Sequence, residues 1–226
     1  MKKLVKKIAY TNLDLEIFPA DTLPMNVRQL KLFQYFSDRY KHLKGVSGEI
    51  VECGVGHGST MLYLCFLAQQ EALPRTIWGF DSFEGFPGPT SFDDSARNPK
   101  KGDWSDTSKE LITRRLKRAG ISDEFINTSL NLVKGFFPDS FKNYTGAPIA
   151  LLHVDVDLYQ SYADALSYFY DYVVDGGLVL FDEYKHEKWP GATKAIDEFL
   201  EHTKQNLIYD ELVEKYYIIK NSKFSN

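Results

Sequence analysis

The sequence predicts an α/β fold, with a mostly parallel sheet covered by helices on both faces. Three observations support this prediction. Short apolar runs alternate with helical stretches along most of the chain, which is the pattern of strand–helix–strand units. The first apolar run leads into a glycine-rich turn, and three later runs end in acidic residues. Glycine and acidic residues at strand ends are typical of ligand sites at the carboxyl edge of a parallel sheet.

The elements follow one another in a regular order. Apolar residues at helical spacing predict a helix over 26–44, ahead of the first strand. We then expect strands at 48–54, 76–81, 130–135, 149–156 and 177–182, and helices at 59–70, 107–119 and 160–173. Gly176 and Gly177 mark the turn into the fifth strand. The chain then ends with a helix over 191–204 and one or two strands within 209–221, which can pair as a hairpin.

Two segments depart from this alternation. Residues 1–25 contain Pro19 and Pro24 and few clear signals, and we interpret them as an irregular N-terminal arm ahead of one domain over 26–226. Residues 84–106 are rich in Pro, Gly, Asp and Ser and are long for a connection. A mobile surface excursion is one interpretation of them. Because this loop leaves directly from Asp81, we favour a loop that folds over a ligand.

Composition limits the class of protein. The chain has 226 residues and a net charge of −4, with no basic excess that would indicate nucleic-acid binding. No stretch has the length of a transmembrane helix and the N-terminus lacks the apolar core of a secretory signal, so we expect a cytoplasmic protein without a membrane partner. Cys53 and Cys65 are interpreted as small core residues. The 15% aromatic content is compatible with a homodimer but does not require one.

The glycine-rich turn lies in the segment EIVECGVGHGST, where Glu52 precedes Gly54, Gly56 and Gly58. Glycines between a strand and a helix let a ligand approach the backbone at a helix N-terminus. The spacing GxGxG differs from the dinucleotide pattern GxGxxG. Glu52 would repel a diphosphate and suits a cofactor with an ammonium group, such as S-adenosylmethionine. A second strand that ends in Asp81 supports a nucleoside, since a carboxylate there holds the ribose hydroxyls; the alternative is a tight turn without a ligand.

Four carboxylates follow the fourth and fifth strands. Asp155 and Asp157 end one apolar run, and Asp182 and Glu183 end the other. Asp155 and Asp182 are expected to face each other across one strand spacing of about 5 Å. Clustered carboxylates repel one another unless a cation joins them, and oxygen ligands favour Mg²⁺. Capping of the following helices is the alternative, but it explains one or two of these residues rather than four.

The histidines are weaker candidates. His186 follows the acidic cluster with Lys185 beside it, and either residue is a candidate general base if its pKa is lowered. A solvated loop residue is the alternative for both. We interpret His153, within the fourth strand, as structural, and His57 as a turn residue that contacts the cofactor or points to solvent.

Five motifs occur in the order found in one known family. They are VECGVGHGST, WGFDSFEGFP, LVKGFFPDSF, LLHVDVDLYQSYADAL and GGLVLFDEYKHEKWPGATKAIDEF. Over roughly residues 26–220 the chain resembles macrocin-O-methyltransferase (TylF-type) proteins. This resemblance implies a Rossmann-like class I S-adenosylmethionine-dependent methyltransferase fold with a seven-stranded sheet. It also implies Mg²⁺-dependent methylation of sugar hydroxyls on antibiotic scaffolds.

The resemblance also assigns roles to residues. It implies a cofactor site formed by Glu52, Gly54, Gly56, Gly58, Ser59, Asp81, Ser82, Lys134 and Gly135, with the metal held by Asp155, Asp182 and Glu183 as in catechol O-methyltransferase. Asp155 or Asp157 is the implied proton acceptor, ahead of His186 or Lys185. Three features depart from the family. Gly56 stands where the family often has an aromatic residue, Glu183 stands where it usually has a second Asp, and the arm that helps to bind substrate is not recognisable.

These observations together predict an S-adenosylmethionine-dependent O-methyltransferase that acts on a small hydroxylated molecule, a sugar or a sugar-bearing natural product. Two alternatives stay open. An NAD-dependent oxidoreductase shares the strand–turn–helix pattern, but the GxGxG spacing and Glu52 count against it. A non-catalytic cofactor-binding module would have lost the acidic residues at the strand ends, and these are intact here.

Overall fold

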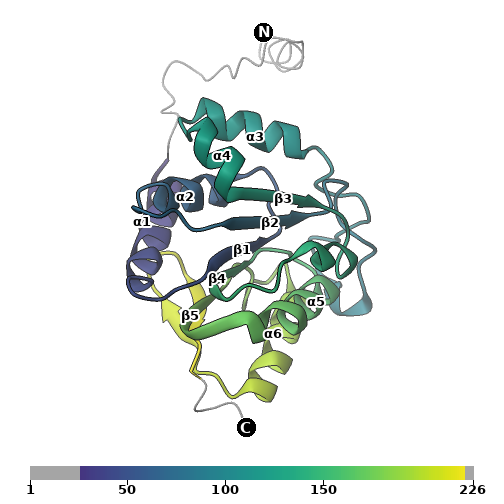
Figure 1. The fold of residues 1–226 in the computed structure, drawn as a ribbon. Helices are drawn as coiled ribbons and strands as arrows, with labels where there is room; N and C mark the ends of the chain where they lie inside the picture. The colour runs from purple at the N-terminus through teal and green to yellow at the C-terminus, as the bar shows by residue number, and fades with distance from the viewer. Residues whose placement is uncertain (1–25, 222–226) are drawn as a thin grey trace.

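The computed structural model describes residues 26–221, so the N-terminal arm predicted at 1–25 lies outside the described residues. The centre of the molecule is a seven-stranded sheet in the order β3-β2-β1-β4-β5-β7-β6 (Figure 1). The strands are β1 (Glu49–Cys53), β2 (Ile77–Asp81), β3 (Leu130–Lys134), β4 (Ile149–Val154), β5 (Val173–Phe181), β6 (Ile208–Asp210) and β7 (Lys215–Ile219). The first five strands are parallel, and β7 pairs antiparallel with β5 and with β6. The predicted α/β fold with a mostly parallel sheet is confirmed.

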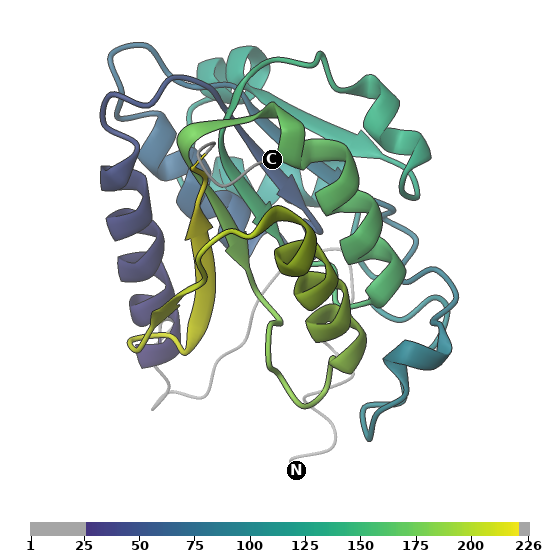
Figure 2. The same ribbon diagram turned by 90° about the horizontal axis from the view of Figure 1, so that it is seen from below.

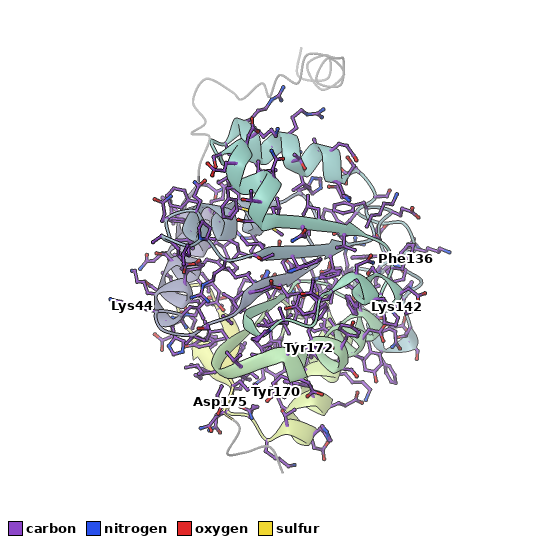
Figure 3. All side chains as sticks on the ribbon, in the orientation of Figure 1. Lys44, Phe136, Lys142, Tyr170, Tyr172 and Asp175 are labelled. Carbon is purple, nitrogen blue, oxygen red and sulfur yellow. The ribbon has the colours of Figure 1, made fainter. Side chains whose placement is uncertain are left out.

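Helices cover both faces of the sheet (Figures 1 and 2). The α-helices are α1 (Val27–His42), α2 (Ser59–Ala68), α3 (Lys109–Arg118), α4 (Asp123–Ser129), α5 (Tyr159–Phe169) and α6 (Pro190–Thr203). One apolar core joins the sheet to α1, α2, α3 and α4, and a second joins its other face to α5 and α6. Side chains fill the space on both faces (Figure 3). All six residues of β4 are buried, which explains why the strand is a continuous apolar run.

Two features of the fold differ from the sequence-based expectations. The short helix α4 was not expected, although Ser122 caps it by accepting a hydrogen bond from the backbone N–H of Phe125 at 3.1 Å. The fifth strand begins at Val173, so the prediction that Gly176 and Gly177 mark a turn into it is wrong. The pairing of β4 with β5 shifts register at this point, and the two glycines allow the strand to bulge rather than end.

Within residues 26–221, no helix combines the length and the apolar character that crossing a lipid bilayer requires.

Candidate active site

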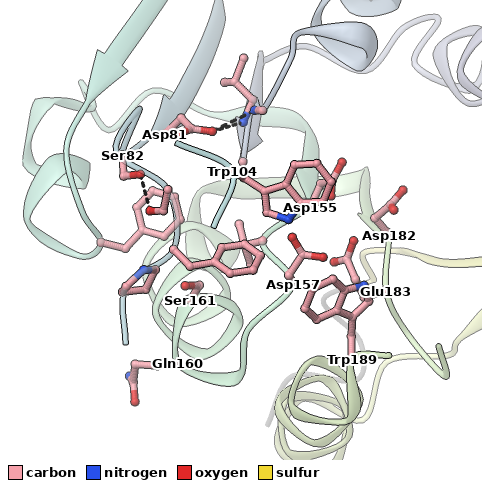
Figure 4. A pocket seen from close by; sticks show the side chains of 18 of the residues that line it. Asp81, Ser82, Trp104, Asp155, Asp157, Gln160, Ser161, Asp182, Glu183 and Trp189 are labelled. Carbon is pink, nitrogen blue, oxygen red and sulfur yellow. Dashed lines mark hydrogen bonds between the residues drawn. The ribbon is translucent and has the colours of Figure 1, made fainter. Parts of the chain in front are cut away.

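A cavity of about 640 Å³ lies at the carboxyl edge of the parallel strands (Figure 4). Its walls come from the segments that follow β1, β2, β4 and β5, and from the loop 84–106. In Figure 4, Asp81 and Ser82 lie on one side of the cavity, and the carboxylates of Asp155, Asp157 and Glu183 lie on the other. The fold therefore brings the glycine-rich turn and the acidic cluster to one space.

Asp81 holds the glycine-rich turn in place. Its Oδ2 accepts hydrogen bonds from the backbone N–H groups of Val55 and Gly56, both at 2.9 Å. Its Oδ1 accepts one from the backbone N–H of Phe83 at 2.7 Å. Both lone pairs of Oδ2 are thus in use, whereas Oδ1 keeps one for a further donor. Because Asp81 lines the cavity, that donor can be the hydroxyl of a ligand.

Gly54 brings the turn into contact with the acidic strand end. Its φ is +84°, and a Cβ at this position would lie 1.7 Å from the backbone oxygen of Asp155. The backbone N–H of Asp155 donates to the carbonyl of Cys53 at 2.9 Å. Only a residue without a side chain fits between these two segments. The ends of β1 and β4 are therefore packed backbone against backbone.

The four carboxylates of the acidic cluster are Asp155, Asp157, Asp182 and Glu183. Burial and the charge of Asp182 raise the pKa of Asp155 well above its ordinary value and raise the pKa of Asp157 to about 7. Burial and the charge of Asp155 likewise raise the pKa of Glu183. A hydrogen bond from the carboxyl group of Glu183 acts in the opposite direction on the pKa of Asp155 but does not offset the rise. The cluster thus carries more negative charge than the surrounding protein compensates, which is the donor set that a hard cation requires.

Asp182 and Glu183 each have a partner. Lys215 of β7 forms an ion pair with Oδ1 of Asp182 and donates a second hydrogen bond to its backbone carbonyl at 3.0 Å. Burial alone would raise the pKa of Asp182, but the Lys215 ammonium outweighs it and lowers that pKa. The carboxylate of Glu183 accepts a hydrogen bond from the Tyr162 hydroxyl at 2.5 Å. In this conformation one oxygen of Glu183 is directed to α5 rather than to the cluster.

His153 and Glu52 form a buried pair below the acidic cluster. Nδ1 of His153 lies 3.1 Å from Oε1 of Glu52, and both residues are 1% exposed. Burial lowers the pKa of His153 to about 4, so its imidazole is neutral at neutral pH. Burial and the charge of Asp155 raise the pKa of Glu52. A ring nitrogen of His153 and one carboxylate oxygen each of Asp155 and Asp182 lie within 4.8 Å of one another.

The other candidate residues divide into two groups. Most of them line the cavity, namely Gly54, Gly56, Ser59, Asp81, Ser82, Gly135, Asp155, Asp157, Asp182, Glu183 and His186. Glu52, Gly58, Lys134 and Lys185 are not among the described residues that line it. Glu52 lies below the cavity floor with His153, and Gly58 is the N-cap of α2. Lys134 forms an exposed ion pair with Glu84 at 3.0 Å.

The loop 84–106 forms one wall of the cavity, through residues that include Phe86, Thr90, Arg97 and Trp104. It contains a buried acid, Asp93, whose Oδ1 accepts a hydrogen bond from the backbone N–H of Tyr159 at 2.7 Å. Leu158, the N-cap residue of α5, has no side chain that can do this. Ser95 donates to the carbonyl of Lys188 at 2.8 Å, and Thr107 donates to that of Gly56 at 2.7 Å. The loop, together with Thr107 directly after it, is therefore attached to three separate segments.

Several residues of the cavity were not predicted from the sequence. Lys215 lies on β7, far along the chain from the other charged groups, and Trp104 and Trp189 lie in irregular segments without periodic signals. His153 was interpreted as structural. The signal that could have identified its position is the period of two along β4, which puts His153 and Asp155 on the same face of the strand.

The chain is similar in sequence to known O-methyltransferases. Residues 26–213 match the family model of macrocin-O-methyltransferase (TylF). Mycinamicin III 3''-O-methyltransferase from Micromonospora griseorubida is 28% identical over 177 residues, which cover 75% of this chain and 66% of that protein. The 8-demethyl-8-(2,3-dimethoxy-alpha-L-rhamnosyl)-tetracenomycin-C 4'-O-methyltransferase from Streptomyces olivaceus is 25% identical over 207 residues, 81% of this chain and 77% of that one. The chain thus spans slightly less than two thirds of the first relative.

The structure of the O-methyltransferase NovP is similar to this one, with a TM-score of 0.71, 25% identity and coverage of 85% of this chain and 80% of that chain. This similarity confirms the predicted Rossmann-like methyltransferase fold with a seven-stranded sheet. Because the family model matches most of the chain, the protein belongs to the macrocin-O-methyltransferase (TylF) family.

Proposed function

We propose that this protein transfers the methyl group of S-adenosylmethionine to a hydroxyl of a sugar or a sugar-bearing small molecule, with a divalent cation, Mg²⁺, at the acidic cluster. The observation that carries this proposal is the contact between the two halves of the cavity. Gly54 packs the glycine-rich turn directly against the backbone of Asp155, so a cofactor on the turn and an acceptor at the carboxylates would be neighbours. Family membership supports the same reaction.

The cofactor would bind along the ends of β1, β2 and β3. Gly54, Gly56 and Ser59 would surround its methionine part, and Oδ1 of Asp81 would accept a hydrogen bond from a ribose hydroxyl. Ser82, Lys134 and Gly135 would lie toward the adenine, while Gly58 shapes the turn into α2 and Glu52 lies beneath that turn, paired with His153. S-adenosylmethionine brings its own activated methyl group, so the protein mainly positions the acceptor and handles its proton.

The metal would be held by Asp155 and Asp182, with Glu183 as a third ligand once its carboxylate turns from Tyr162. These oxygens fit Mg²⁺ because they are clustered, lie at the cavity and are only partly compensated by Lys215. When bound, Mg²⁺ lowers the pKa of a coordinated hydroxyl. Asp157 would accept the proton, since its carboxylate lines the cavity within the cluster and is not one of the three proposed metal ligands. His186, at the cavity rim, is the second candidate for this role.

The acceptor would lie between aromatic side chains. Phe86, Trp104 and Trp189 line the cavity, and the rings of Phe86 and Trp189 are 5.8 Å apart. Aromatic rings combined with carboxylates are typical of sites that bind a sugar by its apolar face and its hydroxyls. The name of the Streptomyces olivaceus relative, which places its reaction on a rhamnosyl group, supports a sugar.

The proposal is tested by calorimetric titration of S-adenosylmethionine and S-adenosylhomocysteine into the purified protein, with and without Mg²⁺. We expect binding of both, and at least a tenfold loss of affinity in Asp81→Ala, because the turn loses two backbone hydrogen bonds and the ribose loses its acceptor. Asp164→Ala, which changes a carboxylate elsewhere in the cavity wall, is the matched control and should keep the native affinity.

The other interpretations predict different results. An NAD-dependent oxidoreductase would bind NAD and neither sulfur-containing ligand. A non-catalytic module would bind S-adenosylmethionine but would transfer no methyl group in a screen of hydroxylated sugars with Mg²⁺. Failure of both ligands to bind, with a folded protein, would refute the methyltransferase proposal.

A further inference from the structure

The acidic cluster has a nitrogen donor on its inner side that the reaction described above does not use. His153 lies in β4, and Asp155 directly follows Val154, the last residue of that strand, so a continued alternation of side chains would direct both to the same side. One ring nitrogen of His153 and one oxygen each from Asp155 and Asp182 lie within 4.8 Å of one another. That separation is compatible with three ligands of one metal ion, since ligands at about 2.1 Å from a metal can lie up to about 4.2 Å apart and small rotations close the rest.

The two nitrogens of His153 have different surroundings. Nδ1 is paired with Oε1 of Glu52 at 3.1 Å. Nε2 has no hydrogen-bond partner among residues 26–221, although the side chain is 2% exposed. Unlike Oε2 of Glu52, Nε2 is not one of the fully buried polar atoms that lack a partner, so it keeps some surface that a small ligand such as a metal ion can reach. The edge of the ring also packs against Phe36, at a centroid distance of 5.2 Å, which restricts its rotation.

We propose that Nε2 of His153 is a ligand of the metal ion at this site and that Glu52 orients the imidazole for it. This inference rests on the proposed function, whose metal it assigns a further ligand. Histidines that bind metals almost always donate their other ring N–H to a carboxylate or a carbonyl. Glu52 is placed to accept that hydrogen bond from Nδ1, so the pair has the arrangement of a carboxylate–histidine–metal site.

A nitrogen ligand changes which ions the site prefers. Mg²⁺ favours oxygen ligands, whereas imidazole suits first-row transition ions. Glu183, the oxygen ligand expected from the sequence, is hydrogen-bonded to Tyr162 instead. With His153 and two carboxylates, the site should bind Mn²⁺ more tightly than Mg²⁺, and part of this preference should depend on His153.

The direct test is pulsed electron paramagnetic resonance on the native protein loaded with Mn²⁺ alone. A ¹⁴N coupling from a directly bound imidazole nitrogen is expected. The matched variants are His153→Gln and His186→Gln, because His186 is the other histidine near the cluster. His153→Gln should remove the coupling and weaken Mn²⁺ binding by about tenfold or more, with a smaller effect on Mg²⁺. His186→Gln should keep the coupling and bind Mn²⁺ within about twofold of the native protein.

The outcomes separate this inference from the proposed function. A native spectrum without ¹⁴N coupling overturns the role of His153 even if Mn²⁺ binds, and it does so without any variant having to fold. Coupling that disappears in His186→Gln assigns the nitrogen to that residue and also overturns the inference. If Mn²⁺ does not bind, both His153 as a ligand and the metal of the proposed function are refuted, while the titration with S-adenosylmethionine still decides whether the cofactor site exists.

Discussion

Gly54 and Gly56 lie in the same turn, but an added side chain would meet different surroundings at the two positions. Both have positive φ values, +84° and +49°. A Cβ on Gly54 would collide with the backbone oxygen of Asp155, whereas nothing lies within 4 Å of a Cβ on Gly56. Gly56 thus has open space where a side chain would lie.

Replacement of these glycines by alanine should separate steric collision from backbone strain. Gly54→Ala should lower the free energy of unfolding by more than about 3 kcal/mol, because the strand ends must move apart. Gly56→Ala is the matched control and should cost about 1 kcal/mol, the strain of a left-handed residue alone. Urea denaturation measures both. Equal costs would show that the contact between Gly54 and Asp155 is absent.

Asp157 makes stability depend on pH in the metal-free protein. Its pKa is about 7 in the folded protein, against 3.8 ordinarily. Between these values the folded protein holds a proton that the unfolded chain has lost, so this residue makes the free energy of unfolding fall as pH rises from about 4 to about 7. Asp157→Asn mimics the protonated form. It should therefore stabilise the metal-free protein by at least about 1 kcal/mol at pH 8, and by clearly less at pH 5, where only part of the interval between the two pKa values has been crossed.

Thermal denaturation at the two pH values, with and without Mg²⁺, checks this expectation. Asp94→Asn is the control, because it changes an exposed carboxylate in the loop 84–106. It should have the same small effect at both pH values. Saturating Mg²⁺ should reduce the advantage of Asp157→Asn at pH 8, since the ion compensates the ionised cluster. An Asp157→Asn effect that is the same at pH 5 and pH 8 would contradict the raised pKa.

At the level of elements, α5 is capped from a distant part of the chain. Asp93, in the loop 84–106, accepts the hydrogen bond from Tyr159 at the start of the helix, while its Oδ2 accepts two from Thr90, at 2.7 and 2.9 Å. Asp93→Ala removes all three hydrogen bonds and leaves the backbone N–H of Tyr159 unpaired. We expect a loss of about 2–4 kcal/mol in the free energy of unfolding.

The helix α4 offers a matched control, because Ser122 caps it locally. Ser122→Ala should cost about 1 kcal/mol and leave the loop 84–106 as resistant to protease as in the native protein. Asp93→Ala should also make that loop easier to cleave. If both variants lose the same stability and neither changes cleavage, Asp93 does not anchor the loop.

The sequence predicted elements well where one physical signal dominates. The strands β1, β2 and β4 are almost wholly buried, so each appears as an apolar run, and the predicted end of β4 differs from the observed one by two residues. The start of β5 was missed because Gly176 and Gly177 read as a turn, and a bulge is decided by pairing with β4. The cavity wall from 84–106 was expected from its length and its origin at Asp81. The anchoring by Asp93 was not, because it joins residues 66 positions apart.

On the scale of the whole molecule, the C-terminal hairpin of β6 and β7 supplies a positive charge to the acidic site. The antiparallel register pairs Phe181 with Tyr216, which places Lys215 next to Asp182. No local pattern in the sequence predicts this ion pair, because it depends on how β7 returns to the sheet. Three strands, β4, β5 and β7, thus contribute charges to one space.

Lys215→Met should reveal this contribution. Loss of the ammonium leaves Asp182 without its counter-ion, and we expect about 2 kcal/mol lower stability in metal-free buffer at neutral pH. Millimolar Mg²⁺ should restore more stability to the variant than it adds to the native protein, since it supplies the missing positive charge. Lys194→Met, which removes an exposed ion pair with Glu198, is the control and should respond to Mg²⁺ as the native protein does.

The attachments of the loop 84–106 have a consequence for how related proteins can diverge. The hydrogen bonds that join Asp93, Ser95 and, directly after the loop, Thr107 to other segments end on main-chain atoms, of Tyr159, Lys188 and Gly56. A main-chain partner is present whatever residue occupies the position. A loop of different sequence that keeps these three polar side chains can therefore dock on the same scaffold. Acceptor preference should be transferable between members by exchanging this one segment, with the turn and the carboxylates left untouched.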